Sequence, residues 1–224
     1  MRVLKINSAR AIWLFAVADM NPAGKAVDHD LLSWLNKTYQ FQKAPSSAFD
    51  FDSETKTLTF SGGKFRCGTD ENGKDRYIAV GLTIYKDGLV ATTESSTADS
   101  ERFLEETIDS VVKEFKLLHP GDVRKKIYYN EMDVRLDRPF SLINPKLAAL
   151  AKRIPELRTE DPRTHFEFSG ISFLPQPDVQ ATLSGFNLER KVNTDWAENR
   201  YFTRSPLQTD AHIKLLEEIE ALLV

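Results

Sequence analysis

The chain has 224 residues, of which 41% are hydrophobic and 28% are charged, with a formal net charge of −3. This length allows one large domain or two small ones with a buried core, and the composition is ordinary for a soluble globular protein. The slightly negative charge excludes a general attraction to nucleic-acid backbones, and the single cysteine, Cys67, excludes an internal disulfide, which favours a cytoplasmic location. No stretch approaches the length of a transmembrane helix, so we expect no membrane.

The first half of the chain is predicted to hold two helices and several strands. The clearest signal is the alternation of Ile78, Val80, Leu82 and Ile84 on one face of a strand, followed by a tight turn at Asp87-Gly88. The expected elements are a buried strand at 11–18, a helix at 29–39 capped by Asp28, a hairpin of strands 56–60 and 64–67 with its turn at Ser61-Gly62-Gly63, strands at 77–85 and 89–93, and a helix ending near 116 that Thr97 or Asp99 caps.

The second half repeats this order of elements. Asn144 and Pro145 have the residue types that begin a helix, and an apolar stripe of Leu147, Leu150, Ala151 and Ile154 follows. The remaining expected elements are strands at 126–136 and 165–174, an extended segment at 179–192, a short strand at 200–202, and a last helix that Thr209 or Asp210 caps and that buries Leu215, Leu216, Ile219, Leu222 and Leu223.

Two sequence matches indicate that one unit was built twice. Phe60-Ser61-Gly62 and Phe168-Ser169-Gly170 lie 108 residues apart, and each glycine is followed by a phenylalanine three positions later. Segments 97–106 and 209–218 also align without gaps, at an offset of 112. We therefore predict an α+β protein of two similar halves, each an antiparallel sheet with a short and a long helix packed on one face. The predicted units are 1–118 and 119–224, packed together as one compact body.

Few residues have the spacing of a catalytic or metal site. Asp28-His29-Asp30 is the densest group of potential metal ligands, but three consecutive helical side chains point in different directions, so helix capping explains them better. Segment 50–56 contains the Glu-x-Lys pattern of some metal-dependent nucleases, and the acidic residues before it are too close in sequence for that site. Ser61-Gly62-Gly63 lacks the Lys-Ser/Thr of a phosphate loop. We predict no metal and no cofactor.

Two surface candidates remain. The segment 193–202 combines an exposed-loop composition with aromatic and arginine side chains, which is typical of interface hot spots; its candidate contact residues are Trp196, Arg200, Tyr201 and Phe202. Basic side chains gather in the second half, and the alternative is that they are ordinary solvated charges. The candidate basic patch is Arg124, Lys125, Lys126, Arg135 and Arg138.

The sequence alone therefore favours a non-catalytic interaction or scaffold subunit that assembles with another protein or with itself. The first alternative is an enzyme whose site lies in the cleft between the two halves, with acidic residues drawn from unrelated positions. The second alternative is a nucleic-acid-binding protein that uses the arginine-rich second half. Whether the chain catalyses a reaction is left open.

Overall fold

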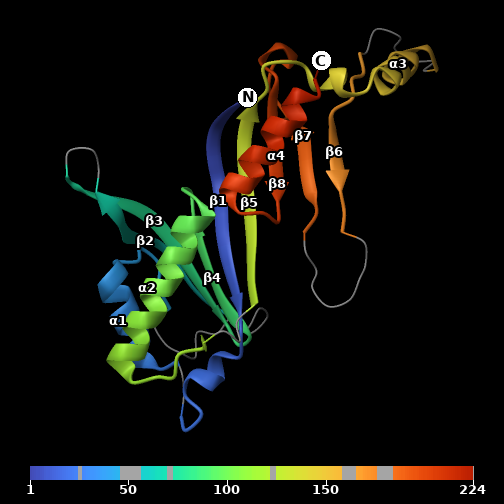
Figure 1. Ribbon diagram of the computed structural model, residues 1–224. Coiled ribbons are helices and arrows are strands. Elements are labelled where there is room, and N and C mark those ends of the chain that lie inside the picture. The colour runs from blue at the N-terminus through green and yellow to red at the C-terminus, as the bar shows by residue number, and fades with distance from the viewer. Residues whose placement is uncertain are drawn as a thin grey trace. The chain divides into compact units, whose positions relative to one another are not determined.

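The protein has an α+β fold, seen in a computed structural model that describes residues 1–24, 27–45, 57–69, 73–121, 125–157, 165–175 and 184–223 (Figure 1). Its four α-helices in this part of the chain are α1 (His29–Tyr39), α2 (Thr97–Phe115), α3 (Pro145–Arg153) and α4 (Thr209–Ala221). The strands are β1 (Arg2–Leu14), β2 (Leu58–Thr69), β3 (Asp75–Tyr85), β4 (Gly88–Thr93), β5 (Lys125–Arg135), β6 (Gly170–Phe173), β7 (Phe186–Arg190) and β8 (Arg200–Ser205).

The order of the strands shows two similar halves. It is β2-β3-β4-β1-β5-β8-β7-β6, in one antiparallel sheet of eight strands. Read outward from the middle, β1, β4, β3 and β2 follow the same order as β5, β8, β7 and β6. In each half the chain runs strand, helix, three strands and helix. The predicted fold class is therefore confirmed, including the two copies of one element order.

Spatial contacts between residues divide the chain into two compact units. We call Ser8–Asn130 the N-terminal unit, and Met1–Asn7 with Glu131–Val224 the C-terminal unit. Because β1 and β5 are long strands, each contributes residues to both units. The boundary between residues 118 and 119, which came from the sequence repeat alone, and the packing of both halves into one body stay predictions.

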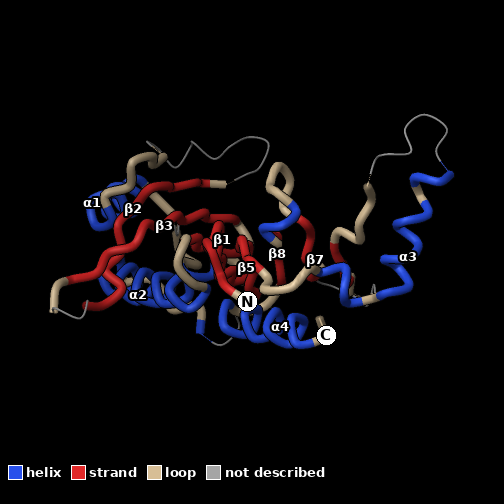
Figure 2. Tube along the Cα trace, turned by 90° about the horizontal axis from the view of Figure 1, so that it is seen from above, coloured by secondary structure: helices blue, strands red, loops and turns tan. Residues whose placement is uncertain are grey.

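The N-terminal unit has a core of aromatic and aliphatic side chains between its strands and α1 and α2. Helix α1 contacts β2 and α2 contacts β4, and the alternating residues of β3 from Ile78 to Ile84 belong to this core. Tyr39 of α1 and Phe103 of α2 meet edge to face, with ring centroids 4.9 Å apart. The period-2 prediction for this strand is confirmed, and Figure 2 shows α2 lying along the strands of its unit.

The C-terminal unit packs α4 against β5, β7 and β8. Leu216 of α4 is fully buried with Met132 and Leu188, and it corresponds to the fully buried Leu104 of α2 in the sequence alignment of the two helices. One predicted core residue is wrong: Leu222 is 63% exposed. Helix α4 ends at Ala221, so Leu222 leaves the apolar stripe as the helix stops.

The predicted hairpin at Ser61-Gly62-Gly63 is wrong, because these residues lie inside the single strand β2. The register with β3 shifts between Phe60 and Gly63, which marks a β-bulge, and Gly62 has a left-handed φ of 68°. Strand β2 continues through these residues to Thr69 and pairs antiparallel with β3 along its length. The second copy of the motif places Gly170 at the first residue of β6, the strand that corresponds to β2 in the strand order.

Local signals predicted the helices well and their first residues less well. Asp28 caps α1 through Leu31 N–H at 2.9 Å, and Asn144 caps α3 with Pro145 at its first position, both as predicted. The cap of α2 is Ser96 rather than Thr97 or Asp99, because its hydroxyl accepts from Asp99 N–H at 3.0 Å. The predicted cap of α4 at Thr209 or Asp210 is also wrong, because both are helical residues that follow Gln208, which makes no side-chain cap.

Candidate interaction surfaces

The predicted contact residue Trp196 lies in a short, well-braced turn of the C-terminal unit. It begins the 3-10 turn Trp196–Glu198, which Asp195 caps by accepting from Ala197 N–H at 2.9 Å. The Arg190 guanidinium lies 4.7 Å from the centroid of the indole ring and donates to the Asp195 carbonyl. Trp196 is nevertheless 48% exposed, so the structure holds a large aromatic side chain at the surface in one orientation.

The other predicted contact residues divide between surface and core. Strand β8 alternates its side chains, so Tyr201 points away from the face that carries Arg200 and Phe202. Tyr201 is only 3% exposed, and its hydroxyl accepts from Phe140 N–H at 3.1 Å. Arg200 pairs with Glu198 at 3.4 Å. Tyr201 therefore supports the loop from beneath and cannot touch a partner directly.

The described residues of the predicted basic patch belong to two different units, and two of them are engaged by other groups. Lys125 and Lys126 belong to the N-terminal unit, Arg135 and Arg138 belong to the C-terminal unit, and Arg124 lies outside the described residues. Lys126 pairs with Glu101 and, at 3.3 Å, with Glu105. These carboxylates, Glu101 first, raise the pKa of the Lys126 ammonium above its usual value. Arg138 donates to the Leu223 carbonyl at 2.8 Å.

Helix α3 carries a surface that sequence reasoning took for core. Its apolar stripe was expected to face inward, yet Leu150 is 60% exposed, Leu147 38% and Ile154 40%, and only Ala151 is buried. Leu157 in the 3-10 turn that follows is 76% exposed. The main contacts of α3 are with the two 3-10 turns that flank it, Phe140–Ile143 and Pro155–Leu157, and Figure 1 shows it at the end of its unit. A contiguous apolar face thus meets solvent.

The charges of α3 all have one sign. The helix contains Lys146, Lys152 and Arg153 and no acidic residue, and all three are exposed. Lys146, Leu150 and Arg153 follow the i, i+4, i+7 spacing that places side chains on one face of a helix. The exposed apolar stripe therefore has a basic edge, and this combination was visible in the sequence as a short helix rich in leucine and lysine.

A groove of about 390 Å³ runs along the other side of α3. Its floor includes Ala148 and Ala149, and Phe166 and Phe168 from the extended segment before β6 form its wall. Phe168 stacks on Phe140 with ring centroids 5.5 Å apart, which ties that segment to the core of the unit. Helix α3 is therefore held from one side, and its leucine stripe is left on the other.

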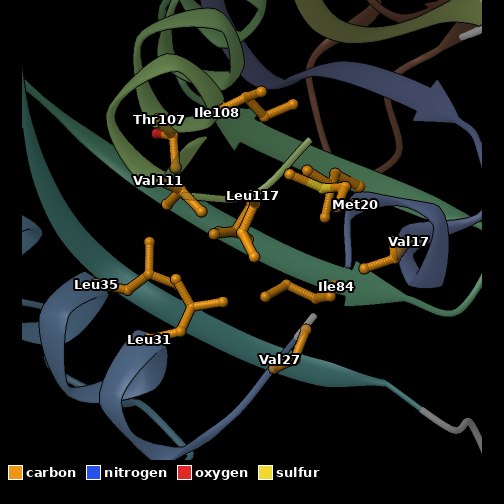
Figure 3. A pocket seen from close by; sticks show the side chains of 12 residues that line it. Val17, Met20, Val27, Leu31, Leu35, Ile84, Thr107, Ile108, Val111 and Leu117 are labelled. Carbon is orange, nitrogen blue, oxygen red and sulfur yellow. The ribbon is translucent and has the colours of Figure 1, made fainter. Parts of the chain in front are cut away.

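The N-terminal unit has a small apolar cavity between α1, α2 and the sheet. Its volume is about 40 Å³, and Figure 3 shows Leu31, Leu35, Ile84 and Val111 among the side chains that point toward it. The one polar side chain in its lining is Thr107, whose hydroxyl already bonds the Tyr39 hydroxyl at 2.9 Å. A cavity this small and apolar stays dry and is a packing gap rather than a ligand site.

Ionisable side chains do not converge on a reaction centre in the part of the chain that the structure describes. No group of three or more His, Cys, Asp or Glu side chains is placed to hold a metal ion there. Asp28 is used as a helix cap, and segment 50–56 lies outside the described residues. Cys67 is buried, and Arg76 Nε donates to its sulfur at 3.0 Å. None of the described helices is long and apolar enough to cross a membrane.

Of the comparisons with known proteins, the one with solved structures found a similarity. No family model matches the chain, and no curated protein matches it. Among solved structures the fold is similar to "Methanococcus jannaschii TBP", with 14% sequence identity and a TM-score of 0.42, over 98% of this chain and 97% of that one.

Proposed function

We propose that this protein is a non-catalytic interaction subunit that binds another protein chain through the leucine stripe of α3. The observation that carries this proposal is the exposure of Leu147, Leu150 and Ile154 on a helix that Asn144 caps at its N-terminus. Full burial of such a side chain gains roughly 1.5–3 kcal/mol, and because these three are partly exposed a partner surface would recover about half of that for each. An amphipathic helix that presents anchors at i, i+3, i+4 and i+7 is a common way to bind a groove on another protein.

The braced Trp196 turn supports the same class of function. A rigid, half-exposed indole loses little conformational freedom on binding, which is why tryptophan is enriched among interface anchors. Arg200 and Phe202 lie beside it in sequence, on the outward face of β8. We propose Trp196 as a second point of partner contact and keep a cytoplasmic location as part of the proposal.

The alternatives have less support among the described side chains. Nucleic-acid binding through the predicted basic patch needs its cations unpaired, whereas Lys126 is already engaged by Glu101 and Glu105. An enzyme needs a nucleophile or base with a positioned partner, and Cys67, a possible nucleophile, is buried against Arg76.

Photo-crosslinking in living cells tests the proposal. A benzophenone amino acid replaces Leu150 in one variant and Ala149, an exposed residue on the other side of α3, in the matched control. We expect covalent adducts with one defined protein from position 150 and few from position 149. Each adduct is identified by mass spectrometry, so a second copy of this chain is distinguished from a different protein. Equal labelling at both positions, or none, would contradict a contact surface on the leucine stripe.

A further inference from the structure

We infer that the partner of α3 is a second copy of this chain, and that α3 of each copy docks on the outer face of α4 of the other. This inference rests on the proposed function, because it names the occupant of the same leucine stripe. The observation behind it is a match in charge and in exposed apolar side chains between these two helices of the C-terminal unit.

The outer face of α4 has the opposite character to α3. Glu217 and Glu218 are exposed near its end, and within the described residues neither makes an ion pair. Leu222, four residues after Glu218, is 63% exposed although it lies beside a well-packed core. The helix contains four acidic residues and a single lysine, Lys214. An exposed leucine with an acidic edge therefore lies in the same unit as an exposed leucine stripe with a basic edge.

The charges beside the exposed leucines have opposite signs on the two helices. On α3, Lys146 and Arg153 flank Leu150 by four and three residues. On α4, Glu218 precedes Leu222 by four residues, and Glu217 lies on the neighbouring face of the helix. When two such helices meet, leucine packs on leucine, and carboxylates of one helix lie near ammonium and guanidinium groups of the other. Complementary charges of this kind fix which partner is accepted and in which orientation.

A twofold axis completes the arrangement. In a symmetric dimer the contact of α3 on the partner's α4 occurs twice, once in each direction. The buried area therefore doubles, and neither copy keeps an unoccupied binding surface. An anionic lipid surface would also attract a basic amphipathic helix. It would not use the exposed Leu222 or the acidic edge of α4, so the second copy accounts for more of the surface.

Sedimentation equilibrium with charge-reversed variants tests this inference. One variant carries Lys146→Glu and Arg153→Glu, a second carries Glu217→Lys and Glu218→Lys, and a third carries all four changes. We expect each two-residue variant to weaken dimerisation by about tenfold or more, and the four-residue variant to restore it, because the charges match again after exchange. Circular dichroism of each variant controls for folding, and Lys125→Glu with Lys64→Glu serves as a charge-matched control remote in sequence from both helices.

Several results would overturn the inferred contact between α3 and the partner's α4. A wild-type chain that is monomeric up to about 100 µM has no useful self-affinity. A four-residue variant no better than the two-residue variants would show that α3 and α4 do not meet. Binding to vesicles that contain phosphatidylserine, without self-association, would assign α3 to a lipid surface. If the chain is monomeric yet position 150 crosslinks to a different protein, this inference fails and the proposed function stands; if position 150 captures nothing, both fail.

Discussion

Ser100 and His212 hold the same position in their respective helices, and each contacts a threonine on the strand before it. Each is the fourth residue of its helix, after a buried threonine at the first position, Thr97 or Thr209. The Ser100 hydroxyl is 3.0 Å from the hydroxyl of Thr93, and His212 Nε2 is 2.9 Å from that of Thr203. This repeated contact ties the first turn of α2 to β4 and the first turn of α4 to β8.

The histidine of this pair makes stability depend on pH. His212 is fully buried, and burial lowers the pKa of its imidazole from 6.5 to about 4. The folded state therefore keeps His212 neutral, while the unfolded state binds a proton below pH 6.5. The stabilising contribution is fully present above pH 6.5 and is lost as the pH falls toward 4, by up to about 3 kcal/mol. Urea unfolding between pH 7 and 4 measures this loss.

A histidine variant separates this effect from other titrations. His212→Leu is expected to flatten the fall in unfolding free energy over that pH range, and His119→Gln, at an exposed histidine, is expected to leave it unchanged. If wild type and His212→Leu lose stability in parallel as the pH falls, the buried imidazole does not cause the dependence.

The sequence predicted the fold class because its evidence was local and repeated. Alternation in β3, the Asp28 and Asn144 caps and the alignment of α2 with α4 each depend on neighbouring residues, and each placed an element correctly. The bulge at Gly62 was read as a turn because glycine at positive φ serves both. Burial was harder to predict: the stripe of α3 has the periodicity of a core helix, and only the structure shows that its side chains are exposed and that its main contacts among the described elements are with two short turns. The burial of Tyr201 was hidden for the converse reason, since an aromatic side chain in a polar segment gives no sign of which face of β8 it occupies.

Lys126 is expected to contribute to stability rather than to binding of phosphate. Its ammonium lies between Glu101 and Glu105 and 4.9 Å from the centroid of the Trp13 ring. Lys126→Met keeps the chain length and removes these interactions, so we expect a loss of about 1 kcal/mol and a drop of a few degrees in Tm. Lys125→Met, at the exposed neighbouring position, is expected to change Tm little. Equal effects of the two variants in thermal denaturation would contradict the assignment.

The bulge in β2 is expected to tolerate no side chain at Gly63. A Cβ there would lie 2.5 Å from the ring of Phe41, which is buried and has no room to move. Gly63→Ala should cost about 2 kcal/mol, as overpacking of a core does. Gly73→Asn serves as the control, because its φ of 75° suits asparagine and nothing lies within 4 Å. A neutral Gly63→Ala in urea unfolding would show that the Phe41 ring does not pack tightly over Gly63.

The cavity of the N-terminal unit offers a stabilising change. Val111→Ile adds one methylene next to a gap of about 40 Å³, so we expect a gain of about 0.8 kcal/mol in unfolding free energy. Val112→Ile, which does not line the cavity, is the matched control and should give no such gain. Thr107→Val removes the hydroxyl partner of Tyr39 and should cost about 1–3 kcal/mol. A loss of stability in Val111→Ile would mean that the cavity is already filled by neighbouring side chains and cannot take the added methylene.

The molar mass of the protein in solution tests the account most directly. Light scattering behind size-exclusion chromatography is measured over a series of concentrations for wild type and Leu150→Glu. We predict that the wild-type mass rises with concentration toward twice 25.5 kDa, while Leu150→Glu stays at 25.5 kDa and keeps the Tm that the wild type has when it is dilute enough to be monomeric. A mass of 25.5 kDa for both proteins at every concentration would contradict self-association. A large drop in Tm for Leu150→Glu would show that the leucine stripe of α3 belongs to the core.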